Sequence, residues 1–179
     1  MPELININPQ KLTPLRQLEP AFGNLEWTEV DGQNTYDNVP HTLKMLGQNA
    51  ISESSHTFGP SANQFAVQMW SCLMGDTVYD LNQPNPEWNT VFCHSRKDGK
   101  DGYVYLIINE SNEMTYVNVP TDATRYTLSS GGKRNNRILL LNGRELKPET
   151  FDALTKRLGA YQNAGTLKLI PGTSTFLVI

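Results

Sequence analysis

The sequence predicts a mainly β protein whose C-terminal part is an antiparallel β-sandwich. Two observations lead to this prediction. From about residue 76 onward, short segments rich in Val, Ile, Tyr, Phe and Thr alternate with turns rich in Gly, Pro and Asn. Before residue 76, short apolar segments and helical patterns follow one another in the strand–helix order of a βα repeat. We therefore expect an α/β segment over residues 1–75 and a β-sandwich over residues 76–179.

The clearest helix is predicted over residues 61–74. Ser61 is a good N-cap, Gln64 completes a capping box, and Gly75 suits the position just after the last turn. The segment is apolar around much of its circumference, so we expect this helix to be covered on more than one side. Two further helices are predicted over 38–48, ended by Gly47, and over 147–159, ended by Gly159.

Strands are predicted wherever short β-branched or aromatic segments lie between turn residues. Asn142-Gly143 is the strongest hairpin signal in the chain, because both residues tolerate the positive φ angles of a two-residue turn. The expected strands are 4–8, 24–30, 50–54, 77–81, 88–95, 102–109, 113–119, 125–129, 137–142, 166–170 and 173–179.

The last predicted strand is apolar on both faces. Alternation along a strand sends Phe176 and Val178 to one side and Leu177 and Ile179 to the other. A strand of this kind belongs between two layers, so something must pack on the outside of the sandwich.

Composition excludes several classes of function. The net charge of −3 argues against a general nucleic-acid binder, which carries a basic excess. No apolar run approaches the roughly 20 residues of a membrane span. The first ten residues, MPELININPQ, lack the basic and apolar regions of a signal peptide. We therefore expect no nucleic-acid partner and no membrane partner.

The cysteines and histidines predict no metal site and no cofactor. Two cysteines do not make a disulfide framework, so we expect Cys72 and Cys93 to be buried thiols outside any disulfide. Cys93 and His94 are adjacent in a predicted strand, so they point to opposite faces and cannot bind one ion together. No zinc-ligand spacing is present.

Four stretches, in this order and spacing, resemble the C-terminal region of glycoside hydrolase family 79, the heparanase and β-glucuronidase family. They are FAVQMWSCLMGDTVYD, GYVYLIINESNEMTYVNVP, YTLSSGGKRNNRILLLNGRELK and LKLIPGTSTFLVI, within about two thirds of the chain. The resemblance implies a remnant of a (β/α)8 barrel, its last βα units, followed by the β-sandwich. It also implies that the chain is the C-terminal part of a retaining glycoside hydrolase, acting on a glycan or glucuronide.

By this resemblance, catalysis needs two carboxyl groups at about 5–5.5 Å, one as acid/base and one as nucleophile. We expect the acid/base residue upstream of Met1. Glu29, at the end of the predicted strand 24–30, is the candidate nucleophile, and Glu19 is the alternative. Asn109-Glu110 has the letters of an acid/base pair but falls in a predicted turn. The isolated chain is therefore expected to be inactive, because a lone nucleophile lacks protonation of the leaving group.

Without a complete barrel, we expect apolar surface around Phe65, Met69 and Trp70, covered by a barrel-bearing partner chain or by self-association. Complete members of this family are often secreted or lysosomal, but the sequence leaves the localisation of this chain unknown.

A second hypothesis is a self-contained carbohydrate-binding or interaction module. Trp88 is then the candidate for stacking on a sugar ring, with Tyr103 and Tyr105 as further aromatic candidates.

Overall fold

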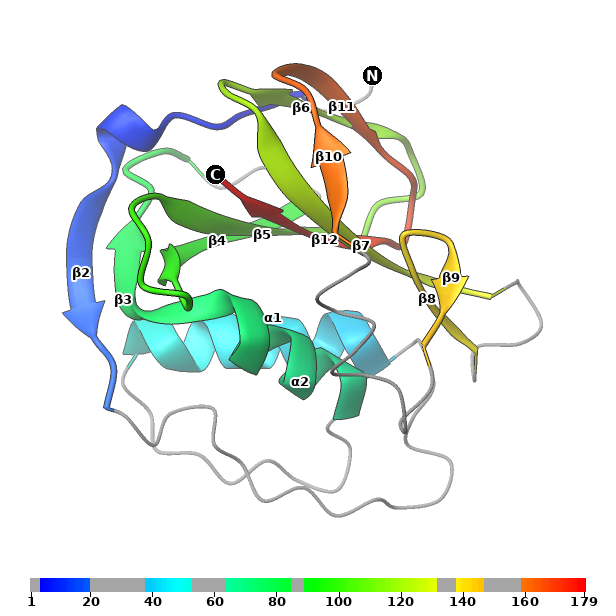
Figure 1. Cartoon of the computed structure of the whole chain (residues 1–179), viewed down its shortest axis with the longest axis horizontal. Helices are drawn as coiled ribbons and strands as arrows, with labels where there is room; N and C mark the ends of the chain where they lie inside the picture. The colour runs from blue at the N-terminus through cyan, green and yellow to red at the C-terminus, as the bar shows by residue number, and fades with distance from the viewer. Residues whose placement is uncertain (1–3, 20–37, 53–63, 85–88, 132–137, 147–158) are drawn as a thin grey trace.

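The computed structural model describes residues 4–19, 38–52, 64–84, 89–131, 138–146 and 159–179 (Figure 1). Within these ranges the chain is mainly β, as predicted. The elements are β1 (Leu4–Asn6), η1 (Pro9–Lys11), β2 (Thr13–Gln17), α1 (Asn38–Ser52), α2 (Gln64–Leu73), β3 (Met74–Asp80), β4 (Asn89–Arg96), β5 (Tyr103–Asn109), β6 (Thr115–Val119), β7 (Ala123–Ser130), β8 (Leu139–Leu141), β9 (Arg144–Glu145), β10 (Ala160–Gln162), β11 (Gly165–Leu169) and β12 (Ser174–Val178).

The strands form two sheets. The larger has the order β2-β3-β4-β5-β12-β7-β8-β9, with β10 beside β7, and its neighbours are antiparallel. The smaller has the order β1-β6-β11, with β1 parallel to β6. Strands from both sides of residue 75 share each sheet, since β1 pairs with β6 and β2 with β3. The expected domain boundary at residue 75 stays a prediction.

The larger sheet is the middle of three layers. On β5, Val104, Leu106 and Ile108 pack into a core with the helices, while Tyr105 and Ile107 pack into a second core with the smaller sheet. Figure 1 shows α1 and α2 lying together against the larger sheet. Neither of these two described helices is long and apolar enough to cross a membrane.

The terminal strand β12 is covered on both faces, as its apolar sequence predicts. Phe176 lies in the core under the helices and Leu177 in the core under the smaller sheet, each 0 % exposed. The described layer over Phe176 is the helix pair of the same chain.

The prediction of exposed apolar surface around the second helix is wrong. Phe65, Met69 and Trp70 are 5 %, 0 % and 2 % exposed. They pack in the core that α1, α2 and the larger sheet share, so α2 needs no second chain to cover these side chains. The expectation that this helix is covered on more than one side is confirmed.

Two glycines predicted to end helices have other roles. Gly47 lies inside α1, where the ring of Phe92 packs so closely that a Cβ would be 2.4 Å from its Cζ. Gly75 lies in β3, where a Cβ would be 2.5 Å from the backbone oxygen of Ser95. Close packing therefore selects glycine at both positions. Residues 50–52, predicted as part of a strand, continue α1.

The cysteine prediction holds in part. Neither Cys72 nor Cys93 forms a disulfide, and Cys93 is buried in β4. Cys72, the second-last residue of α2, is exposed, contrary to the prediction.

The Asn142-Gly143 hairpin is confirmed. It joins β8 to β9 with φ angles of 49° and 82°, so both residues adopt the positive φ that this turn requires. The sequence missed β2, which contains Pro14, and the short strand β10. The predicted strand 24–30 and most of the predicted helix 147–159 lie outside the described residues.

The contact between Gly47 and Phe92 predicts that Gly47→Ala destabilises the protein by about 1–3 kcal/mol in urea unfolding. At a solvent-exposed position inside a helix, Gly→Ala raises the free energy of unfolding by about 1 kcal/mol. The sign of the change therefore shows whether the Phe92 ring packs against Gly47. Gln48→Ala, at an exposed neighbouring position, is the matched control and shifts stability by less than about 0.5 kcal/mol. A stabilising Gly47→Ala would contradict the contact.

Candidate functional site

The sequence-predicted catalytic residues are only partly described. Glu19 follows β2 and is exposed, beside Leu18, whose backbone N–H donates to the Asp76 carbonyl at 2.7 Å. Glu29 and Trp88 lie outside the described residues. The assignment of Glu29, or alternatively Glu19, as a nucleophile stays a prediction.

The Asn109-Glu110 pair lies where the sequence predicts, at the turn after β5. Asn109 is buried, and its side-chain amide donates to the carbonyls of Glu113 and Leu169 at 3.1 and 3.2 Å. The Glu110 carboxylate pairs with Lys44 of α1 at 3.0 Å. These bonds hold the turn against its neighbours, which is a structural role.

A pocket of about 210 Å³ lies beside the edge of the larger sheet. Its walls come from four elements: Leu15 of β2, Ile51 of α1, residues 78–81 with Gln83 at the end of β3, and residues 91–94 of β4. The register between β3 and β4 runs to the pair Tyr79–Cys93, so the pocket lies where the two strands cease to pair. It combines apolar walls with one carboxylate and one amide, a composition that suits a small ligand.

The rim of this pocket is held by Asn82. Its side-chain amide donates to the Lys11 carbonyl at 2.7 Å and to the Thr13 hydroxyl at 2.8 Å. Its backbone N–H donates to the Asp80 carboxylate at 2.8 Å. Asn82 has a φ of 51°, which Asn tolerates better than most residues. The turn after β3 is thereby fixed to the start of β2.

Two residues around the pocket, Cys93 and His94, have potentially reactive side chains, and both side chains are neutral at pH 7. Burial raises the pKa of the Cys93 thiol, so it stays protonated. Burial lowers the pKa of His94 to about 4, and its Nδ1 lies 2.9 Å from the Gly75 carbonyl. Since that oxygen only accepts, Nδ1 carries the proton. The Trp70 ring meets the imidazole edge-on at a centroid distance of 4.9 Å.

Cys93 and His94 do not work together. His94 contacts Trp70 on the helix side of β4, whereas Cys93 belongs to the core on the opposite side, as alternation predicts. Within the described ranges, no three His, Cys, Asp or Glu side chains gather as metal ligands. Among its described lining residues, the pocket therefore has the chemistry of a binding site and no activated nucleophile.

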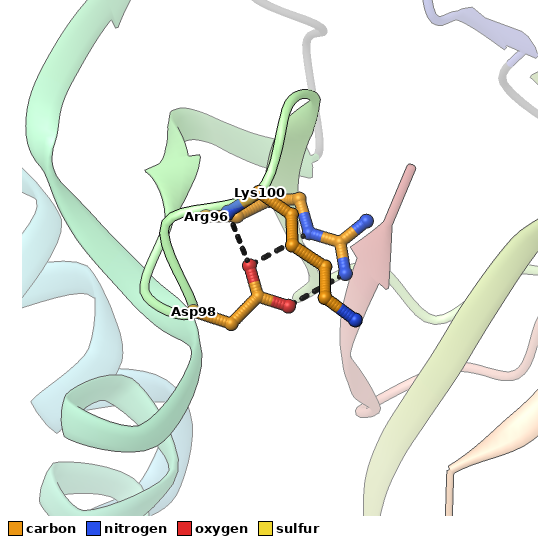
Figure 2. Close-up of polar contacts among 3 residues, drawn as sticks. All are labelled: Arg96, Asp98 and Lys100. Atoms are coloured by element: carbon orange, nitrogen blue, oxygen red, sulfur yellow. Dashed lines mark hydrogen bonds and ion pairs between the residues drawn. The ribbon is translucent and has the colours of Figure 1, made fainter.

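A further charged cluster lies in the turn between β4 and β5 (Figure 2). Arg96 donates to both carboxylate oxygens of Asp98, at 3.1 and 2.7 Å, and the Lys100 backbone N–H donates to the same carboxylate at 3.0 Å. The hydrogen bonds from Arg96 hold the pKa of Asp98 below its ordinary value. This carboxylate is fully engaged by its own turn and stabilises the hairpin.

The pocket could not be predicted from the sequence, because two of its walls come from β2 and from the end of α1. Pro14 argues against a strand at β2, and the end of α1 was expected to be a strand. The one local signal of the pocket is the Asp-Leu-Asn sequence at 80–82, which is typical of a turn held by side chains. Of the aromatic candidates, Tyr105 is buried in the core, and Tyr103 packs edge-on against Tyr79 at 5.1 Å.

Comparison with known proteins supports a glycoside-hydrolase fold. No protein-family model and no curated protein matches the chain. Two solved structures match it with a TM-score of 0.51 and 11 % identity: a xyloglucanase of glycoside hydrolase family 44 from Paenibacillus polymyxa and a family 44 endoglucanase from Clostridium thermocellum. Each match covers 82 % of this chain but 30 % of the enzyme. The chain thus shares its fold with part of these enzymes, and family 79 is not singled out.

The buried imidazole predicts a specific loss of stability in acid. The unfolded chain binds a proton at His94 below about pH 6.5, while the folded chain resists protonation down to about pH 4. Stability should therefore fall between these pH values by about 3 kcal/mol in total. His94→Phe should remove this component of the pH dependence in urea unfolding. His41→Gln, at an exposed position on α1, is the control and should keep it. An unchanged pH dependence in His94→Phe would contradict the assignment.

Proposed function

We propose that this chain is the C-terminal part of a retaining glycoside hydrolase of the family 79 type, supplying its accessory β-sandwich and at most one catalytic carboxylate. The end of the catalytic barrel is then proposed within residues 1–75, apart from β1 and β2, which pair with β6 and β3 of the two sheets. The observation that carries this proposal is the match of 82 % of the chain to 30 % of a xyloglucanase and of an endoglucanase. The ordered family 79-like stretches of the sequence support it independently.

In this proposal the chain does not hydrolyse glycosides alone. Glu29, or alternatively Glu19, attacks the anomeric carbon, but the residue that protonates the leaving oxygen belongs to a segment or chain that carries the rest of the barrel. The exposed carboxylate of Glu19 and the neutral Cys93 and His94 are in keeping with an incomplete centre.

The complete enzyme acts on a glycan or glucuronide and uses no cofactor. Because Phe65, Met69 and Trp70 are buried within the chain, self-association through these side chains is not expected, and a barrel-bearing partner would dock on another surface. We expect no role for nucleic acid or membrane.

The alternative is a self-contained carbohydrate-binding module, with Trp88 as the stacking residue. The pocket favours it, because Tyr79, Asp80 and Gln83 offer an aromatic ring, a carboxylate and an amide in one place. Trp88 follows these residues closely in the chain, just before β4.

An activity assay tests the proposal. The purified chain, incubated with an aryl glucuronide, xyloglucan and soluble cellulose, should release no sugar above the blank. Glu29→Gln and Glu19→Gln should behave like the unaltered chain, because neither carboxylate has its acid partner.

Hydrolysis by the isolated chain would overturn the incomplete-enzyme proposal. If Glu29→Gln abolishes that activity and Glu19→Gln does not, Glu29 remains the nucleophile. The proposal that the acid/base residue lies outside this chain would then be wrong. The nucleotide sequence upstream of the Met1 codon is an independent check, since the proposal expects an adjoining or neighbouring reading frame with βα units and an Asn-Glu strand end.

A further inference from the structure

Tyr161 is a large aromatic side chain held in solvent. It lies on β10 and is 70 % exposed, a larger fraction than any other large hydrophobic side chain of the described residues. Isolated exposed apolar residues are common and need no explanation. Tyr161 differs because two separate sets of bonds fix its position.

The first set fixes its backbone and the second fixes its ring. β10 pairs with β7 so that Tyr161 lies opposite Thr124. The Tyr161 hydroxyl donates to one carboxylate oxygen of Asp122, and the other oxygen accepts the Ala164 N–H at 2.9 Å. The hydrogen bonds that Asp122 accepts keep its pKa below the ordinary value, so the carboxylate is ionised at neutral pH. The ring is thus preorganised, which reduces the entropy lost when a ligand binds.

Close to the ring, the backbone at Gly159 lies against β7. Residue 159 directly precedes β10 and is two residues before Tyr161. Position 159 is a glycine, and a Cβ there would lie 2.6 Å from the Thr124 methyl and 2.8 Å from the Tyr126 hydroxyl. The chain therefore lies close against β7 beside the exposed ring. A larger residue at 159 would force these groups apart and raise a ridge there.

We propose that Tyr161 is a stacking platform for a neutral glycan chain, with Asp122 and Thr124 bonding the sugar hydroxyls. The apolar C–H face of a pyranose stacks on a tyrosine ring, and the carboxylate and hydroxyl at the ring edge accept and donate hydrogen bonds to its rim. The negative charge of Asp122 disfavours a uronic acid polymer at the same place. This site goes beyond the proposed hydrolase role, because binding here needs no catalytic carboxylate.

Affinity electrophoresis of the full chain in gels containing hydroxyethyl cellulose, xyloglucan or polygalacturonate tests the platform. The chain should be retarded by at least one neutral polysaccharide and not by polygalacturonate. Tyr161→Ala should weaken this binding about tenfold or more, while Tyr161→Phe, which keeps the ring, should stay within about threefold. Position 161 is exposed, so an unchanged thermal midpoint in both variants would show that folding is intact.

Two control variants sharpen the result. Ile170→Ala removes a side chain that is 62 % exposed and should leave binding unchanged. Trp88→Ala discriminates between the two aromatic candidates: retained binding assigns the site to Tyr161, whereas loss of binding in this variant alone would move the site to Trp88. If neither neutral polysaccharide retards the chain, the platform proposal is overturned. Equal loss of binding in Tyr161→Phe and Tyr161→Ala would also overturn it.

Discussion

The fold depends on two adjacent strands that are apolar on both faces. β5 and β12 lie at the centre of the larger sheet, and alternate residues along each strand enter different cores. Exposing either face would leave side chains such as Leu106 or Leu177 in water, at a cost of about 2 kcal/mol for each. A single two-sheet sandwich covers one of these faces. The helices α1 and α2 cover the other, and they make the described part of the chain a three-layer unit.

In this layered structure, the buried side chains and the groups accessible to a ligand lie in different places. Side chains with reactive potential, Cys93 and His94, lie next to the cores and are held neutral by burial. Groups that remain available to a ligand lie at the margins of the larger sheet: the pocket beside β2 and β3, and Tyr161 on β10. The described residues thus combine a buried interior with accessible groups at the sheet edges. The same combination explains why the structure offers binding surfaces and no activated nucleophile within the described residues.

Much of the fold could be predicted from sequence, because β-branched segments and turn residues are local signals. The strands from β3 to β8, the Asn142-Gly143 turn and the two-sided burial of β12 follow from them. Gly47 was misjudged because its role lies in a tertiary contact with Phe92, and β2 was missed because Pro14 argues against a strand. The candidate site was less predictable: strand alternation separates Cys93 from His94, but sequence carries no signal for the bond that fixes Tyr161 to Asp122, 39 residues away.

Native-state hydrogen exchange tests most directly whether the helix layer belongs to the same cooperative core as the strands. If it does, the amides of Met69 and Trp70 in α2 and of Leu106 and Phe176 in the larger sheet exchange only through global unfolding, with free energies equal within about 1 kcal/mol. Denaturant should lower all four values with the same slope. Exchange of the α2 amides through local opening, several kcal/mol below that of the strands, would contradict the account, because the face of β5 and β12 that the helices cover would then need another partner.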